Sequence, residues 1–228
     1  MTDPGMRFWK SSVGRKVLMS VTGLMMVLFV VLHVLGNSTI YFNWLNAYSE
    51  HLHALPALIW AYRVFMLAVL SVHVFFGLQL ALENNEAKPL AYVCKRNLQA
   101  TFASKNMIWT GTIIAIYLVY HLLHFTAQVI NPEFSASHNA DALGRPDVYA
   151  MVVLNFQNLF ISLSYIFAMT ALALHLTHGL QSLFQTLGLN NEKTMPLIIK
   201  TGAITAIILS LIYISIPVFV LTGVLKGQ

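Results

Sequence analysis

The chain has 228 residues, of which 57% are hydrophobic and only 9% are charged. Soluble domains carry about 25% charged residues, so this composition indicates a membrane protein. With one cysteine, Cys94, the chain excludes an internal disulfide, a Cys-rich zinc site and a four-cysteine iron–sulfur cluster. The net charge of +5 does not indicate nucleic-acid binding, because the basic residues are placed as loop charges between apolar runs.

Five stretches are long and apolar enough to cross a bilayer as helices, which requires about 20 mostly apolar residues. In chain order they are 17–40, 57–82, 107–130, 151–187 and 201–225. The fourth is longer than the hydrocarbon core requires, so we expect it to tilt or to project into water. We expect no internal repeat. The sequence thus predicts an all-α membrane protein, a bundle of five transmembrane helices in a single domain, 1–228.

Residues typical of helix boundaries flank these stretches. Proline suits a helix start, and asparagine or glycine suits a helix end. The flanking residues are Pro56, Pro196, Asn84, Asn85 and Gly188.

The distribution of Lys and Arg predicts the orientation of the bundle. With the N-terminus inside, ten basic residues fall on the inner side and three on the outer side. The positive-inside rule then predicts a cytoplasmic N-terminus and a C-terminus outside. We expect a multi-pass protein of the cytoplasmic membrane of a bacterium. The inner residues are Arg7, Lys10, Arg15, Lys16, Lys88, Lys95, Arg96, Lys105, Lys193 and Lys200, and the outer ones are Arg63, Arg145 and Lys226.

Six of the nine histidines lie inside the apolar stretches, where an ionisable group is costly and indicates function. A neutral histidine that bonds across helices is an equal alternative for any one of them. Four helices that each carry at least one favour a shared role. The six are His33, His73, His121, His124, His175 and His178, whereas the loop residues His51, His53 and His138 are expected to be solvated.

The depths of these histidines sort them into two pairs. At about 1.5 Å per residue, His33 lies about 24 Å from the inner end of its stretch and His121 about 21 Å. His73 lies about 25 Å from the outer end of its stretch, and His175 lies deeper still. We therefore expect an outer pair, His33 and His121, above an inner pair, His73 and His175.

Two imidazoles that face each other from different helices suit the axial ligation of haem iron. Zinc usually needs four ligands, and no acid or thiol accompanies these pairs. A proton relay normally includes Asp or Glu, which the cores of these stretches lack. Two haems are therefore the preferred interpretation. His124 and His178 each follow a pair member by three residues, so spacing leaves open which one binds iron and which contacts a propionate, lines a quinone pocket or packs.

Four segments, in the order of the stretches, carry a resemblance to a known family. They are SVTGLMMVLFVVLHVLGNS, SVHVFFGL, GTIIAIYLVYHLLHF and LHLTHGLQSLFQTLG. The chain resembles the single-subunit, two-haem cytochrome b membrane anchor of succinate:quinone oxidoreductases, which comprise succinate dehydrogenases and quinol:fumarate reductases. The resemblance implies two haem b groups whose iron is held by His33 with His121 and by His73 with His175.

Glycines of the family pattern indicate which of two neighbouring histidines is the ligand on the third and fourth helices. The family places a glycine ten residues before the third-helix ligand, and Gly111 stands ten before His121. It places another four residues after the fourth-helix ligand, and Gly179 stands four after His175. One position departs from some fumarate reductases of this type, because Ala173 stands where they carry a proton-conducting glutamate.

The resemblance also implies partners and a substrate. An iron–sulfur subunit and an FAD flavoprotein subunit would dock on the cytoplasmic side, around Lys95, Arg96 and Lys105, in a complex that could be dimeric. The substrate would be a membrane quinone, with menaquinone expected. These basic residues could equally serve only to set the topology.

Residues near the expected haems suggest contacts for quinone and propionates. Glu50 is the only carboxylate between the first two stretches, which makes it the candidate proton acceptor for quinone. Arg63 could bind a propionate or a quinone oxygen, or it could snorkel to the interface. Ser20 and Thr22 could bond the inner propionates, although such hydroxyls often bond their own helix.

Two other interpretations remain open from the residues. The chain could be the cytochrome b subunit of another membrane dehydrogenase, of the formate dehydrogenase or hydrogenase type. It could also be a haem-free channel, transporter or assembly protein that uses its histidines for packing or for protons. The soluble subunits that co-purify would test the first, and a reduced-minus-oxidised spectrum would test the second.

Overall fold

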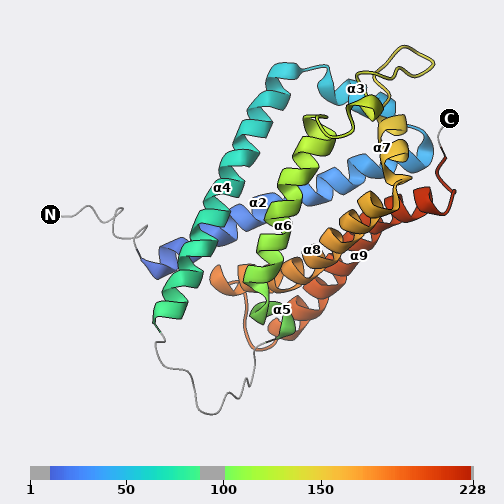
Figure 1. Cartoon of the computed structure of the whole chain (residues 1–228). Helices are drawn as coiled ribbons and strands as arrows, with labels where there is room; N and C mark the ends of the chain where they lie inside the picture. Colours follow the sequence, from blue (N-terminus) through green and yellow to red (C-terminus); the bar gives the residue numbers. More distant parts are fainter. Residues whose placement is uncertain (1–10, 88–100, 227–228) are drawn as a thin grey trace.

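The computed structural model describes residues 11–87 and 101–226, which form a set of long helices (Figure 1). Five of these are long and apolar enough to cross a membrane: Ser12–Phe42, Pro56–Glu86, Met107–Thr126, Leu159–Thr186 and Met195–Leu221. They follow the order of the predicted stretches and confirm the all-α fold with five membrane-spanning helices. One of them begins at Pro56 and another begins at Met195, with Pro196 in its first turn, where a proline loses no helical hydrogen bond.

The spans consist of the following elements. The first comprises α2 (Ser12–Ser38) and the short 3-10 helix η1 (Thr39–Phe42), and the second is α4 (Pro56–Glu86). The third comprises α6 (Met107–His121) and a π-helical turn, η2 (Leu122–Thr126), and the last two are α8 (Leu159–Thr186) and α9 (Met195–Leu221). The connections contain α3 (Leu45–His53), α5 (Phe102–Lys105), η3 (Pro132–Phe134) and α7 (Val148–Phe156).

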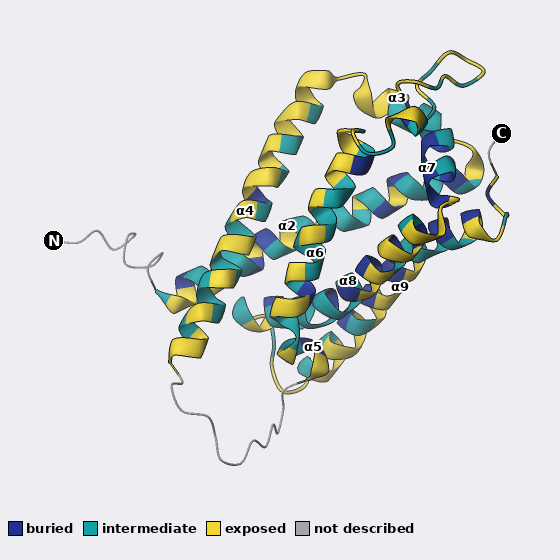
Figure 2. Ribbon diagram, viewed as in Figure 1, coloured by how far each residue is buried: buried dark blue, intermediate teal, exposed yellow. Residues whose placement is uncertain are grey.

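Helix α8 packs along α9 on one side and along α6 on the other, and it also contacts α2 (Figure 1). Helix α4 contacts mainly α2, and Figure 2 shows most of its surface as exposed. The large hydrophobic residues exposed on α4 are mostly Leu, Val and Phe. Lipid can cover such a face without hydrophobic cost, so the arrangement agrees with a bundle in a bilayer.

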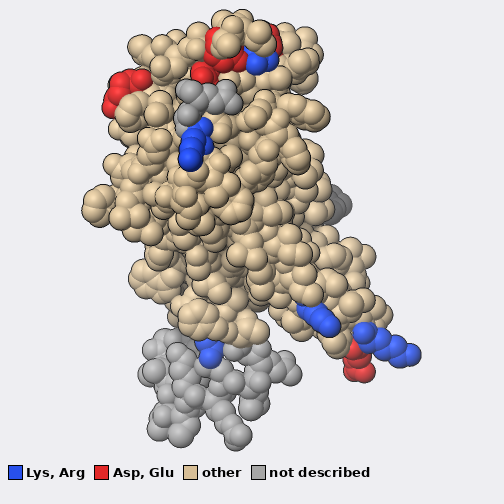
Figure 3. Space-filling model, turned by 90° about the vertical axis from the view of Figure 1, so that its right-hand side faces the viewer, with Lys and Arg blue, Asp and Glu red and all other residues tan. Residues whose placement is uncertain are grey.

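On the face shown in Figure 3, charged side chains gather towards the two ends of the molecule, and the surface between them is almost uncharged. Helices α3 and α7 lie at one end, and α5 lies at the other (Figure 1). An uncharged band between charged ends is what the hydrocarbon core of a membrane requires of a spanning protein.

The predicted fourth stretch, 151–187, contains two helices. Helix α7 ends at Phe156, and α8 begins at Leu159 after a break of two residues. The side chain of Asn158 accepts hydrogen bonds from two N–H groups in the first turn of α8 and so caps it. The hydroxyl of Ser162 donates to the carbonyl of Phe156 at 2.6 Å. The extra length of this stretch therefore forms a separate short helix.

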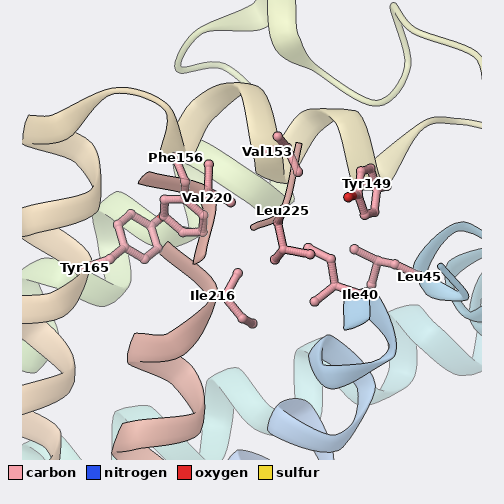
Figure 4. Close-up of a cluster of buried hydrophobic side chains, with 9 residues drawn as sticks. All are labelled: Ile40, Leu45, Tyr149, Val153, Phe156, Tyr165, Ile216, Val220 and Leu225. Carbon is pink, nitrogen blue, oxygen red and sulfur yellow. The ribbon is translucent and has the colours of Figure 1, made fainter. Parts of the chain in front are cut away.

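A buried cluster closes the bundle at the end that holds α3 and α7 (Figure 4). Its side chains come from η1, α3, α7, α8, α9 and the segment after α9. They are Ile40, Leu45, Tyr149, Val153, Phe156, Tyr165, Ile216, Val220 and Leu225. Because Tyr165 belongs to this cluster, its ring on α8 is held firmly beside α6.

Candidate functional site

The inner pair consists of His73 on α4 and His175 on α8, whose ring centroids lie 6.5 Å apart with their planes at 62°. Each ring also meets a threonine from a neighbouring helix. Thr22 Oγ1 on α2 lies 3.3 Å from Nδ1 of His73, and Thr110 Oγ1 on α6 lies 3.2 Å from Nδ1 of His175. The second and fourth spans thus supply the rings, and the first and third supply a hydroxyl for each.

Two glycines bring helix backbone close to the inner pair. A Cβ atom at Gly23 would lie 3.4 Å from Cε1 of His73, and one at Gly111 would lie 3.4 Å from Cε1 of His175. A methyl group would already be in van der Waals contact with the ring at these positions, so little room remains for a larger side chain on that side. The glycine that the family pattern marked on the third helix therefore packs against the fourth-helix histidine.

The outer pair consists of His33 on α2 and His121 on α6, whose ring centroids lie 6.0 Å apart with nearly perpendicular planes. Other aromatic rings surround these two. Phe29 stacks on His33 at 5.2 Å, Tyr213 lies 6.1 Å from it, and Tyr117 stacks on His121 at 5.8 Å. The two pairs join the helices that the depth argument joined, the first with the third and the second with the fourth.

His124 belongs to a buried polar network, with only 2% of its surface exposed. Its Nδ1 lies 2.9 Å from the hydroxyl of Tyr165, and its Nε2 lies 2.8 Å from Oδ1 of Asn155. The same tyrosine hydroxyl lies 3.5 Å from Nδ1 of His121. Both ring nitrogens of His124 therefore have hydrogen-bond partners within the protein. This favours His121, and not His124, as the partner of His33 in the outer pair. The π-helical turn η2 presents His124 to this network.

His178 lies one turn after His175 on α8, and its Nδ1 is buried without a hydrogen-bond partner among the described residues. A buried polar atom left unpaired costs about 1–3 kcal/mol, so a group that bonds it would be favoured there. Gly179 has no atom within 4 Å of the position of its missing Cβ. The second glycine of the family pattern therefore makes no close contact within the described part of the chain.

A cavity of about 140 Å³ lies beside His33, between α2, α3 and α7. Its polar lining includes Asn37, Tyr48 and Ser49. A Cβ atom at Gly36 would lie 2.6 Å from the Tyr48 hydroxyl, so only glycine allows the tyrosine to reach this position. Hydroxyl groups and a histidine therefore meet in one partly apolar recess next to the outer pair.

Glu50 lies on α3 but does not line this cavity. Its side chain is 56% exposed, and its Oε2 lies 3.6 Å from Nη1 of Arg145. Arg145 is bound more closely by Asp141, at 2.7 Å. The hydrogen bond from Arg145 lowers the pKa of the Asp141 carboxyl to about 2. Glu50 therefore sits on an exposed part of α3, beside the loop that carries Asp141 and Arg145.

The remaining predicted residues lie on α2, α4 and α5. The guanidinium of Arg63 lies 5.0 Å above the ring of Trp60 on α4. Ser20 is buried on α2, at 8% exposure, and Lys105 ends α5 with its side chain exposed. Lys95 and Arg96, the other two residues of the expected docking surface, lie outside the described residues.

Comparison with known proteins identifies the family. A family model described as "Succinate dehydrogenase/Fumarate reductase transmembrane subunit" matches residues 85–212, which include α6, α7 and α8. No curated protein and no solved structure matches the chain. The match covers more than half of the sequence and includes His121 and His175, the third- and fourth-helix members of the two pairs. The chain therefore belongs to the family of succinate dehydrogenase/fumarate reductase transmembrane subunits and is a multi-pass membrane protein.

Proposed function

We propose that the chain is the two-haem cytochrome b anchor of a succinate:quinone oxidoreductase complex. It would carry electrons between a membrane quinone, with menaquinone expected, and iron–sulfur and FAD flavoprotein subunits on the cytoplasmic side. The observation that carries the proposal is the presence of two histidine pairs, each drawn from two helices, in one apolar bundle. Family membership favours this function over that of a formate dehydrogenase or hydrogenase cytochrome b.

The separation of the rings would allow both imidazoles of a pair to bind one iron. Two metal–nitrogen bonds of about 2 Å, plus the distance from each nitrogen to the centre of its ring, amount to roughly 6 Å between centroids. The observed separations are 6.0 Å for the outer pair and 6.5 Å for the inner pair. Among residues 11–87 and 101–226, no three His, Cys, Asp or Glu side chains gather at one point, so these sites offer two protein ligands each.

The chain's own residues would bind and orient the cofactors. His33 and His121 would hold the outer haem, and His73 and His175 the inner haem. The unpaired Nδ1 of His178, one turn beyond His175, suits a hydrogen bond to an inner propionate. Bound haem supplies reversible one-electron transfer, and ligands and surroundings tune its potential.

The cavity beside His33 is our proposed quinone site. Tyr48 and Ser49 can hydrogen-bond a quinone carbonyl there, and the apolar part of the lining suits a quinone ring. Glu50, on the same helix, remains the proposed proton acceptor at the margin of the site. Its pairing with Arg145 would then have to open or exchange when a proton is transferred.

Replacement of Glu50 tests this role. We expect Glu50→Gln to abolish quinol-linked turnover and to leave the haem spectrum intact. Arg145→Met is the matched control, because it breaks the same ion pair and keeps the carboxylate. Unaltered turnover in Glu50→Gln would remove Glu50 from the site, and equal loss in both variants would assign the effect to the ion pair.

The function itself is tested by purification of the native complex from membranes. We expect flavin and iron–sulfur subunits to co-purify with the chain, and the reduced-minus-oxidised spectrum to show a b-type α-band. A complex without that band would overturn the haem assignment, and partners of another dehydrogenase would overturn the assignment of the complex.

A further inference from the structure

Residues 19–33 and 107–121 share the pattern Met-x2-Thr-Gly-x9-His, so the chain contains an internal repeat where none was expected. The first copy, MSVTGLMMVLFVVLH, lies within α2, and the second, MIWTGTIIAIYLVYH, is the whole of α6. Each copy ends on a histidine of the outer pair. The threonine and glycine of each copy lie three turns earlier in the same helix.

The threonine of each copy contacts a histidine of the inner pair, which belongs to a different helix. Thr22 meets His73 and Thr110 meets His175, with both threonines buried, at 7% and 4% exposure. The glycine that follows each threonine lets the helix approach the ring closely. Each copy of the repeat therefore supplies one histidine to the outer pair. It also places a threonine hydroxyl beside one histidine of the inner pair.

The direction of the two hydrogen bonds follows from the other contacts of the hydroxyls. Thr22 Oγ1 lies 2.7 Å from the carbonyl oxygen of Leu18, and Thr110 Oγ1 lies 3.1 Å from that of Asn106. A carbonyl oxygen can only accept, so each hydroxyl hydrogen is directed to its own helix. Only the lone pairs of the hydroxyl then remain for the imidazole.

The imidazole must therefore donate in both contacts. Nδ1 of His73 and of His175 carries the hydrogen, and Nε2 of each ring is bare.

We infer that Thr22 and Thr110 are positioning residues that fix His73 and His175 as Nδ1–H tautomers, with both Nε2 atoms free for the iron of the inner haem. The inference rests on the proposed two-haem function. A hydrogen bond donated by the distant ring nitrogen orients a ligand and raises its basicity. A more basic iron ligand favours the ferric state, so these hydroxyls would lower the midpoint potential of the inner haem.

Redox titration of the intact complex, followed by absorbance, tests the inference in Thr22→Val and Thr110→Val. We expect each variant to raise the midpoint potential of the inner haem, identified as the haem that His73→Ala removes, and to shift its low-spin ferric EPR signal. The outer haem keeps its potential. Thr22→Ser and Thr110→Ser restore the original potential, because serine keeps the hydroxyl oxygen.

The matched control is Thr112→Val, which makes the same chemical change two residues along α6 at an exposed position. We expect it to leave both potentials unchanged. Loss of the inner haem from the valine variants with recovery in the serine variants would also support the inference, since the hydroxyl is then required.

Two results would contradict the inference. One is an unchanged inner potential and EPR signal in both valine variants, and the other is failure of serine to restore what valine removes. Failure of the proposed function is distinguishable, because the wild-type complex would then lack the haem that depends on His73 before any threonine is replaced.

Discussion

The inner and outer histidine pairs offer the same two imidazoles but hold them by different means. Helix hydroxyls and glycines of a repeated segment hold the inner pair. The outer pair lies among aromatic rings, and a buried network of His124, Tyr165 and Asn155 stands behind one of its members. Since surroundings tune the potential of a haem, this difference would allow the chain to adjust the two proposed haems independently.

The hydrogens of the outer network can be placed by the same reasoning. The amide nitrogen of Asn155 donates to the Met151 carbonyl at 2.8 Å, so its Oδ1 must accept from Nε2–H of His124. Nδ1 of His124 is then bare and accepts from the hydroxyl of Tyr165. The tyrosine oxygen is left to accept from His121 across a long contact of 3.5 Å. The contact between Tyr165 and His121 is longer than the two threonine–histidine contacts of the inner pair.

The largest effect should come from filling the glycine positions of the inner pair. Gly23→Leu and Gly111→Leu place a branched side chain where a Cβ atom alone is in contact with a histidine ring, so each should eliminate the inner haem and spare the outer one. Haem quantification with redox titration measures this. Thr112→Leu is the control, because it places the same side chain at the exposed position next to Gly111. Retention of both haems in the two inner variants would show that close helix approach is not needed.

A smaller effect, on the outer haem instead of the inner one, is expected from Tyr165→Phe. The change leaves the bare nitrogen of His124 and the donor nitrogen of His121 unpaired, at a cost of about 1 kcal/mol of stability. We expect a lower melting temperature of the complex and a raised potential of the outer haem, with the inner haem unchanged. A shift of the inner haem instead would mean that the two regions are coupled.

The smallest effect concerns the loop above the outer pair. The Asp141 carboxylate accepts hydrogen bonds from the N–H groups of Leu143 and Arg145, and its pKa is lowered to about 2 by the Arg145 side chain. The ionised Asp141 carboxylate stabilises the loop fully when the pH is above the unfolded pKa of about 3.9. This contribution is lost as the pH falls towards the lower pKa of the folded state. Amide hydrogen exchange, corrected for its intrinsic rate, should show this loop opening below about pH 4.

Asp141→Asn provides the comparison for this pH effect. Asparagine cannot ionise, so the variant should show the same exchange at the two Asp141-bonded amides above and below this pH range. If exchange in the native protein is equally independent of pH, the ion pair with Arg145 does not hold the loop.

Hydropathy and helix rise were sufficient to predict the spans and the pairing of the histidines, because membrane thickness and helix geometry constrain both. The break before α8 was not predicted, since Asn158 lies within a mostly apolar run and its capping role depends on the local backbone. The repeat was missed because its copies share only four defining residues among interchangeable apolar ones. The partners of His124 lie on other helices, and spacing along α6 could not reveal them.

The most direct test of the account counts haem per polypeptide in the purified complex and in four single His→Ala variants. We predict two haem b in the wild type and one in each variant. His33→Ala and His121→Ala should lose the same redox component, and His73→Ala and His175→Ala should lose the other. Two haems retained in any of these variants, or fewer than two in a wild-type complex made under full haem supply, would contradict it.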